Sequence, residues 1–193
     1  MLAGNGMTVD THAKLLPTRY GDDTLVYLPR FGYEFRMPEE NERLVYSGRG
    51  PTESYRDKCL ASHIGVFETT VSEHFEHNIR PQENMAHNET QWVSVSNLTG
   101  HGLLALSTGR SFSFNCSHYT TEHLTKIEHD FDLVPIKETV VNIDYAQSGV
   151  GSTSCGPALP DALRLQEPEF DFSFRLLPAF FNDVDPFDEC GRK

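Results

Sequence analysis

The sequence predicts an all-β fold in which antiparallel sheets pack face to face as a sandwich. Short segments alternate between apolar and polar residues, which is the pattern of half-buried strands. Turn residues separate these segments at roughly 8–12-residue intervals, a spacing typical of sandwiches. Only one short stretch shows helical spacing. The 193 residues fit one domain, and a chain of this size buries roughly 70% of its unfolded surface, which is enough for a core.

The predicted strands are the segments in which the alternation is clearest. They are residues 24–28, 33–37, 43–46, 91–96, 103–107, 111–115, 139–145 and 170–176. The third is predicted to stop at the turn residues 47–51. The fifth and sixth flank Thr108, Gly109 and Arg110, a short loop that predicts a β-hairpin between them. In the last segment, alternate phenylalanines face one side of the strand.

One helix is predicted, over residues 120–129. Thr120 or Thr121 provides its N-cap, and Leu124 and Ile127 lie three residues apart on one face. A helix of two or three turns is too short to connect parallel strands, so the sheets are expected to be antiparallel.

The chain divides into one β-sandwich domain over residues 1–178 and a tail over residues 179–193. The tail is acidic and rich in turn residues, and we expect it to be an appendage of the sandwich.

Charge and hydropathy exclude several classes of partner. The formal net charge of −12 repels phosphate backbones, so no nucleic acid is expected. No apolar run reaches the length of about 18 residues that spans a membrane, and the first residues lack the pattern of a signal peptide. We therefore expect a cytoplasmic protein, or a periplasmic or secreted one if a longer gene product carries a signal. The four cysteines match no CxxC metal pattern and are expected to be reduced.

Residues 48–57, GRGPTESYRD, form a turn that carries several charges. Arg49, Glu53, Arg56 and Asp57 could bind a ligand, or they could hold a long loop in place through ion pairs. The second use is the commoner one, and we favour it.

Residues 80–92, RPQENMAHNETQW, are polar and end in the single tryptophan. Gln82, Glu83, Asn84 and Trp92 are the residue types of a sugar site, in which an aromatic face packs on the pyranose and polar groups bind its hydroxyls. The alternative is a structured loop whose amides satisfy its own backbone, with Trp92 in the core. The sequence does not separate the two.

The histidines do not form a metal-binding pattern. His74 and His77 are three residues apart and would face opposite sides of a strand. An aldose epimerase needs a histidine acid and a glutamate base facing one sugar, for which His118 and His129 are candidates that no spacing supports. The carboxylates likewise give no pair that the sequence assigns as acid and nucleophile.

Cys155 lies between glycines and a proline in residues 142–160, NIDYAQSGVGSTSCGPALP. It could be a nucleophile, a metal ligand, a disulfide partner or the wall of a pocket. Gly149, Gly151 and Gly156 predict a bent, exposed loop, which suits a nucleophile as well as a loop that reaches over a neighbouring surface. The turn lacks the lysine of a phosphate-binding P-loop.

Five segments, in this order, resemble one family. GRGPTESYRD, RPQENMAHNETQW, FNCSHYTTEHL, NIDYAQSGVGSTSCGP and FDFSFRLLP are similar to the C-terminal domain of the large bacterial β-galactosidases of glycoside hydrolase family 2. In heterodimeric members this domain is a separate small chain. The resemblance covers residues 8–178.

The resemblance implies a supersandwich of the galactose-mutarotase-like type that works as part of a retaining β-galactosidase. The catalytic glutamates, and the Mg and Na ions, belong to a (β/α)8 barrel that this chain lacks, so the isolated chain is expected to be inactive and to hold no cofactor. The family's terminal domain lends a loop carrying Trp or Cys to the rim of the active site. Cys155 occupies that position, with Ser154 and Gly156 beside it.

The partners implied are a β-galactosidase large chain or barrel domain, a β-galactoside substrate such as lactose, and further copies in an oligomer. The other hypotheses from the sequence are a stand-alone carbohydrate-binding module and a mutarotase-like aldose epimerase.

Two departures from the family pattern stand out. The chain has less sequence before residue 8 than the family domain, so it looks shortened at its N-terminus. Met85 occupies the position of the usual glycine after PQEN, which puts in doubt any tight turn at that point.

Overall fold

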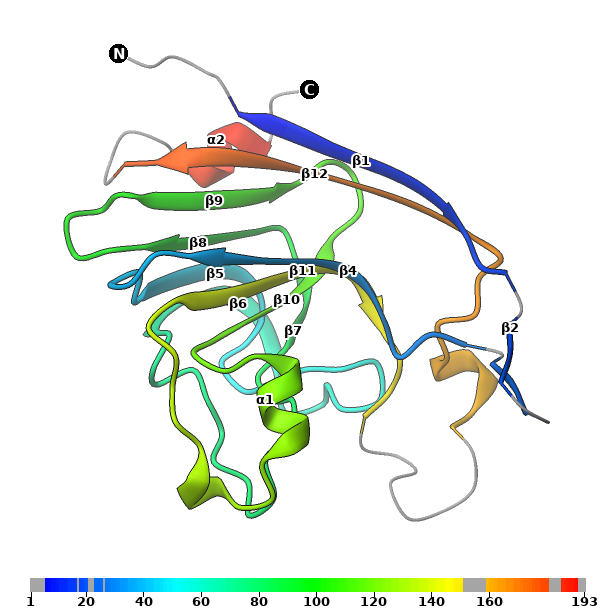
Figure 1. Ribbon diagram of the computed structural model, residues 1–193. Helices are drawn as coiled ribbons and strands as arrows, with labels where there is room; N and C mark the ends of the chain where they lie inside the picture. Colours follow the sequence, from blue (N-terminus) through cyan, green and yellow to red (C-terminus); the bar gives the residue numbers. More distant parts are fainter. Residues whose placement is uncertain are drawn as a thin grey trace.

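A computed structural model describes residues 6–16, 18–20, 23–25, 27–150, 159–180 and 185–190. It consists mainly of two antiparallel sheets that pack against each other (Figure 1), so the prediction of an all-β sandwich is confirmed. The larger sheet has the strand order β1 (Met7–Lys14), β12 (Glu169–Ala179), β9 (Gly102–Ser107), β8 (Trp92–Ser96), β5 (Arg43–Gly50) and β6 (His63–Thr70). The smaller has the order β4 (Arg30–Met37), β11 (Thr139–Gln147), β10 (Phe112–Ser117) and β7 (His87–Thr90).

The remaining elements are short. β2 (Thr18–Tyr20) and β3 (Asp23–Leu25) pair with each other alone. The helices are α1 (Thr121–Lys126) and α2 (Pro186–Cys190), with 3-10 turns at Asp130–Asp132 and Asp161–Leu163. None of the described helices is long and apolar enough to cross a membrane.

The core lies between the inner faces of the two sheets. Alternate residues of each strand point into it, as the two-residue period requires. The larger sheet contributes Leu44, Tyr46, Val93, Val95, Ala105, Phe172 and Phe174, and the smaller contributes Met37, Phe112, Phe114, Cys116, Val141 and Ile143. Each large apolar side chain buried here contributes about 1.5–3 kcal/mol to folding. The alternation of phenylalanines in residues 170–176 therefore marks a strand of the core.

The predicted end of the third strand at residues 47–51 is wrong, because β5 continues to Gly50. Its glycines serve close packing instead of a turn. A Cβ on Gly48 would lie 2.6 Å from Thr90 Oγ1, and one on Gly50 would lie 2.3 Å from the Tyr46 hydroxyl oxygen. A composition typical of turns can thus occur within a strand that two neighbours approach closely.

The predicted hairpin around Gly109 is also wrong. β9 belongs to the larger sheet and β10 to the smaller, so the loop between them carries the chain from one layer to the other. Gly109 has a φ of +136°, which only glycine adopts readily. β9 already pairs with β8 and β12 on its two sides, which leaves no edge for β10.

The sequence prediction missed β1, β2, β6 and β7. β1 and β6 are the two edges of the larger sheet, where one side of the strand has no partner among the described strands. Their side chains are mostly exposed or half-buried, which weakens the alternation that the prediction relies on.

The predicted helix is confirmed with a shorter length. Thr120 is the N-cap, and its Oγ1 accepts a hydrogen bond from the backbone N–H of His123 at 3.1 Å. The helix ends at Lys126 because Ile127 is extended. Leu124 is its buried residue.

A second apolar cluster covers the outer face of the larger sheet. It contains Trp92, Leu104, Leu106, Leu177 and Ala179, which alternate with core residues along their strands. Helix α2 of the tail lies beside this face, next to β9 and β12 (Figure 1).

Two contacts hold α2 in this position. The ring of Phe187 meets that of Trp92 edge to face at a centroid distance of 5.6 Å. Arg175 forms an ion pair with Glu189 at 3.4 Å. Trp92 is 4% exposed, so the tail helix contributes to the burial of the single tryptophan.

Phe187→Ala is expected to lower the free energy of unfolding by about 1 kcal/mol, because it removes the aromatic pair with Trp92, although Phe187 itself is 61% exposed. Urea unfolding followed by Trp92 fluorescence measures this directly, since the chain has one tryptophan. The native emission should also move to longer wavelength as water reaches the indole. Ile79→Ala, at an apolar side chain that is 94% exposed, is the control and should change neither quantity. Equal effects of the two substitutions would contradict the role given to α2.

Candidate functional site

The outer face of the smaller sheet is polar and buried. Asn142 and Asp144 on β11 alternate with core residues, and so do Ser113, Asn115 and Ser117 on β10. The segment between β6 and β7 covers them, and the Asn115 side-chain amide donates a hydrogen bond to the backbone oxygen of Asn84 on that segment. Most groups on a buried polar face of this kind are expected to be hydrogen-bonded.

A cluster of charged side chains lies at one end of this face. Arg30 of β4 donates hydrogen bonds to Asp144 at 3.0 Å and to Glu83 at 2.8 Å. Gln147 donates to the same Asp144 oxygen at 3.1 Å. Gly32 makes room for the Asp144 side chain, since a Cβ there would lie 2.2 Å from Oδ1. The cluster thus joins β4, β11 and the loop that contains Glu83.

The cluster has two carboxylates for one guanidinium, and burial dominates its titration. Burial raises the pKa of Asp144 to about 7, while Arg30 acts in the opposite direction. Burial also raises the pKa of Glu83, again against the effect of Arg30. Asp144 is 1% exposed, so its ionised form depends on Arg30 and Gln147 for compensation.

Asp144 therefore makes stability depend on pH. The carboxyl keeps its proton in the folded chain up to pH of about 7 but loses it near pH 4 in the unfolded chain. Its contribution to stability is complete below pH 4 and is lost as pH rises through 7.

Asp144→Asn should abolish this component, because the amide does not titrate. The free energy of unfolding of the variant, measured relative to that of the parent chain, should therefore be about 2 kcal/mol higher at pH 8 than at pH 5. One pKa unit corresponds to about 1.4 kcal/mol. Urea unfolding at the two pH values gives this difference. Asp10→Asn, at an exposed aspartate of β1, is the control. If the difference in unfolding free energy between Asp144→Asn and the parent does not change with pH, the raised pKa of Asp144 is contradicted.

Hydrogen bonds hold the residues that directly follow β11. The Ser148 hydroxyl donates to the oxygen of Leu28 at 2.6 Å and accepts from the N–H of Leu165 at 3.0 Å. The Val150 N–H donates to Asp57 Oδ1 at 3.1 Å. Leu165 follows residues 151–158 in the sequence, so Ser148 connects the segments before and after them.

The principal candidate residues follow directly in the sequence. Cys155, Ser154 and Gly156 fall within residues 151–158, outside the described part of the chain. Their role as a pocket wall stays a prediction.

The charged side chains of residues 48–57 mainly hold neighbouring parts of the chain in place. Arg49 pairs with Glu89 at 2.6 Å, Arg56 donates to the backbone oxygen of Arg164 at 3.1 Å, and Asp57 holds Val150. These contacts support the structural interpretation of this charged segment.

The structure does not bring the four candidate sugar-binding residues together. Gln82 is exposed, Glu83 binds Arg30, and the Asn84 side chain bonds to the backbone of Glu76. Trp92 lies on β8 of the larger sheet and is buried beneath α2. Its ring face is therefore not part of a site with the other three.

Met85, at the position of the usual glycine, adopts a backbone conformation that favours glycine. Its φ is +55°, and its N–H donates to Glu53 at 2.9 Å. The left-handed conformation costs a residue with a Cβ about 1 kcal/mol. The hydrogen bond to Glu53 helps to hold this conformation in place.

The histidines have separate environments. His74 and His87 are buried and hydrogen-bonded to each other through Nε2 atoms 2.7 Å apart. Burial lowers their pKa values to about 4 and about 3, so both rings are neutral at pH 7. His77 instead pairs with Asp130 at the surface, so His74 and His77 do not converge.

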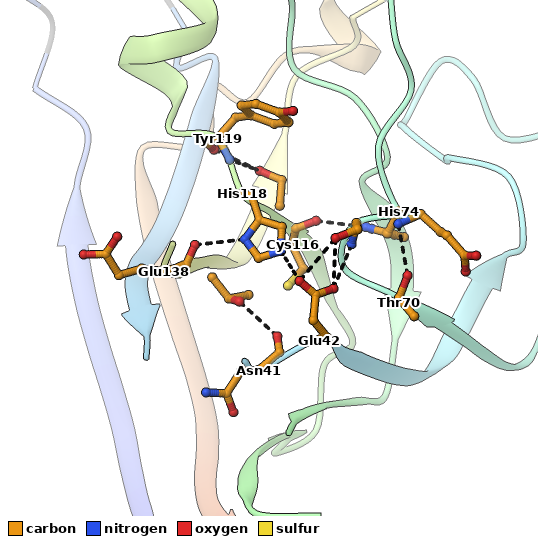
Figure 2. Close-up of polar contacts among 12 residues, drawn as sticks. Asn41, Glu42, Thr70, His74, Cys116, His118, Tyr119 and Glu138 are labelled. Atoms are coloured by element: carbon orange, nitrogen blue, oxygen red, sulfur yellow. Dashed lines mark hydrogen bonds and ion pairs between the residues drawn. The ribbon is translucent and has the colours of Figure 1, made fainter. Parts of the chain in front are cut away.

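The two epimerase candidates also differ in their surroundings. His118 lies between Glu42 and the backbone oxygen of Glu138 (Figure 2). The side chains of His118 and Glu42 are hydrogen-bonded to each other. A catalytic acid and base that act on one sugar must instead both face that sugar. His129 stacks on Phe131. Among the described residues, no group of three or more His, Cys, Asp or Glu side chains could hold a metal ion.

Sequence reasoning missed Arg30, Asp144 and Ser148. The available signal was the alternation in residues 139–145, which places Asp144 on the face opposite Ile143. That signal does not show burial, because the cover over this face comes from residues distant in sequence.

The fold and this site define an antiparallel β-sandwich domain in which the outer face of the smaller sheet is polar and buried. The chain belongs to the β-galactosidase small chain family, whose model matches residues 1–176. A β-galactosidase of Staphylococcus xylosus is 45% identical over 150 residues, covering 78% of this chain and 15% of the relative.

Other β-galactosidases match over a similar share of this chain. A β-galactosidase of Actinobacillus pleuropneumoniae is 39% identical over 79% of this chain, and one of Kluyveromyces lactis is 34% identical over 77%. The chain spans only about 15% and 14% of the lengths of these relatives.

Proposed function

We propose that this chain is the small-chain part of a retaining β-galactosidase of glycoside hydrolase family 2 and completes the rim of its active site. The substrates are terminal β-galactosides such as lactose. The single observation that carries the proposal is the similarity to a β-galactosidase, 45% identity over 78% of the chain. The catalytic glutamates, with the Mg and Na ions of the family, lie in a barrel supplied by another chain or by a further domain.

Within this proposal, Cys155 forms part of the pocket wall, with Ser154 and Gly156 beside it. The hydrogen bonds of Ser148 and Asp57 support this role, because they fix the base of the loop on the sandwich. A wall residue needs such a base, since a displacement of about 1 Å weakens substrate positioning.

The partner is a β-galactosidase large chain or barrel domain, and the complete enzyme is an oligomer in the cytoplasm. Exposed apolar side chains support a large interface: Ile64 and Val66 on the edge strand β6 are 56% and 52% exposed, and Leu60 beside it is 101% exposed. An obligate interface of this kind buries more than about 2,000 Å² in total.

Co-production with a matching barrel-containing chain should give hydrolysis of o-nitrophenyl galactoside, which the 193-residue chain alone should not catalyse. The reason is that the reacting acids lie in the barrel. Initial rates for each chain alone and for the mixture provide the measurement. A rate for the mixture no greater than that of the larger chain alone would overturn the proposal, and so would enzyme-like turnover by the small chain alone.

Cys155→Ala in the assembled enzyme should raise KM or weaken acceptor binding, while kcat changes by less than about tenfold, because the side chain acts by contact. Asp57→Ala should produce the same pattern, since it releases Val150. Steady-state kinetics with lactose distinguish KM from kcat, and Asp10→Asn serves as the control. Loss of kcat by orders of magnitude at unchanged KM would show that Cys155 takes part in the chemical step.

A further inference from the structure

A cavity of about 240 Å³ opens at the end of the sandwich where β10 begins. Its walls come from the end of β5, the turn after it, β7, the start of β10 and the irregular part of β11. The residues that matter for its chemistry are Arg49, Arg56, Asn88, Arg110, Ser113 and Tyr145. Each of these residues lies within the described part of the chain.

Three arginines surround this cavity in a chain whose net charge is −12. Arg49 is compensated by Glu89 at 2.6 Å. Arg56 lies 3.6 Å from Glu167 and donates to the backbone oxygen of Arg164. These two guanidiniums therefore already have partners.

Arg110 has a different environment. Its guanidinium carbon lies 3.8 Å from the centre of the Tyr145 ring, and within the described residues it forms neither a hydrogen bond nor an ion pair. The ring orients the guanidinium but uses none of its N–H donors. The cavity thus has one excess positive charge with free, directional donors.

Ser113 provides the second, independent observation. It is 3% exposed, it lines the cavity, and its Oγ has no hydrogen-bond partner. A buried hydroxyl without a hydrogen-bond partner is unfavourable, and a ligand oxygen would supply the missing partner. The hydroxyl is fixed by its place on β10, between the core residues Phe112 and Phe114.

The size of the cavity limits the ligand. Sites for drug-sized molecules usually have about 300–1,000 Å³, so this smaller cavity fits a single compact group. Guanidinium and hydroxyl donors together match the oxygens of a carboxylate or a phosphate.

We propose that this cavity is an oxyanion-binding site in which Arg110 and Ser113 donate hydrogen bonds to a carboxylate or phosphate group. The group belongs either to a small anion in solution or to an acidic side chain of the rest of the enzyme. Both sources present the same chemistry to the site. The inference does not depend on galactoside hydrolysis, because it concerns binding to this chain alone.

Isothermal titration of the 193-residue chain with inorganic phosphate and with citrate, at constant ionic strength in NaCl, tests the site. Saturable binding with a Kd near the millimolar range is expected for one charged group. Arg110→Gln should weaken it at least about tenfold, which corresponds to about 1.4 kcal/mol. Arg110→Lys should give an intermediate loss, since it keeps the charge but not the forked donors.

Two further variants make the test specific. Ser113→Ala should weaken binding without lowering the urea midpoint of the free chain, because it removes an unsatisfied hydroxyl. Arg80→Gln, at an exposed arginine outside the cavity, should leave binding unchanged. Absence of saturable binding with both probes overturns the proposal, as does an equal loss in Arg80→Gln and Arg110→Gln.

The assembled enzyme distinguishes the two sources of the anion. If an acidic side chain fills the cavity, assembly abolishes phosphate and citrate binding, and Arg110→Gln weakens the association of the chains. If a free anion is the ligand, the assembled enzyme binds the probes as the single chain does.

Discussion

The contact between the inner faces of the two sheets is the constraint on which the rest of the structure depends. Phe112 and Phe114 of the smaller sheet meet Tyr46, Phe172 and Phe174 of the larger one in a single core cluster. Once these residues face inward, the alternation along each strand determines which residues face outward. The polar outer face of the smaller sheet and the apolar outer face of the larger one both follow from that arrangement.

The two outer faces are stabilised in different ways. On the smaller sheet, Asp144 and Asn115 are buried because a polar loop covers them, and hydrogen bonds with Arg30 and Asn84 compensate for the lost hydration. On the larger sheet, Trp92 and its neighbours are apolar, and the tail helix contributes to their cover. The first arrangement places charged side chains close to the end of β11, whereas the second completes the burial of an apolar surface.

This division fits the proposed role of a domain that helps to shape the active site of a larger enzyme. The hydrogen bonds of Ser148 and Asp57 hold the residues that precede residues 151–158. The proposed oxyanion cavity lies at the same end of the sandwich, since Ala146 lines it and Ser148 follows two residues later. A domain of this kind contributes by positioning, and its effect on a reaction appears in binding before it appears in the chemical step.

The sequence by itself determined the all-β class, most strands of the core and the family, and it limited the N-cap of α1 to Thr120 or Thr121. Strong alternation such as Phe170, Phe172 and Phe174 identifies a core strand locally, and the motifs that identify the family are contiguous segments. The tertiary structure alone decided that Gly48 and Gly50 lie within a strand, that β9 and β10 belong to different sheets, and that Trp92 lies apart from Gln82, Glu83 and Asn84. Each of these depends on how closely segments distant in sequence approach one another. The same reason explains Asp144, whose pKa and role follow from the Arg30 and Gln147 side chains beside it and from the loop that excludes water.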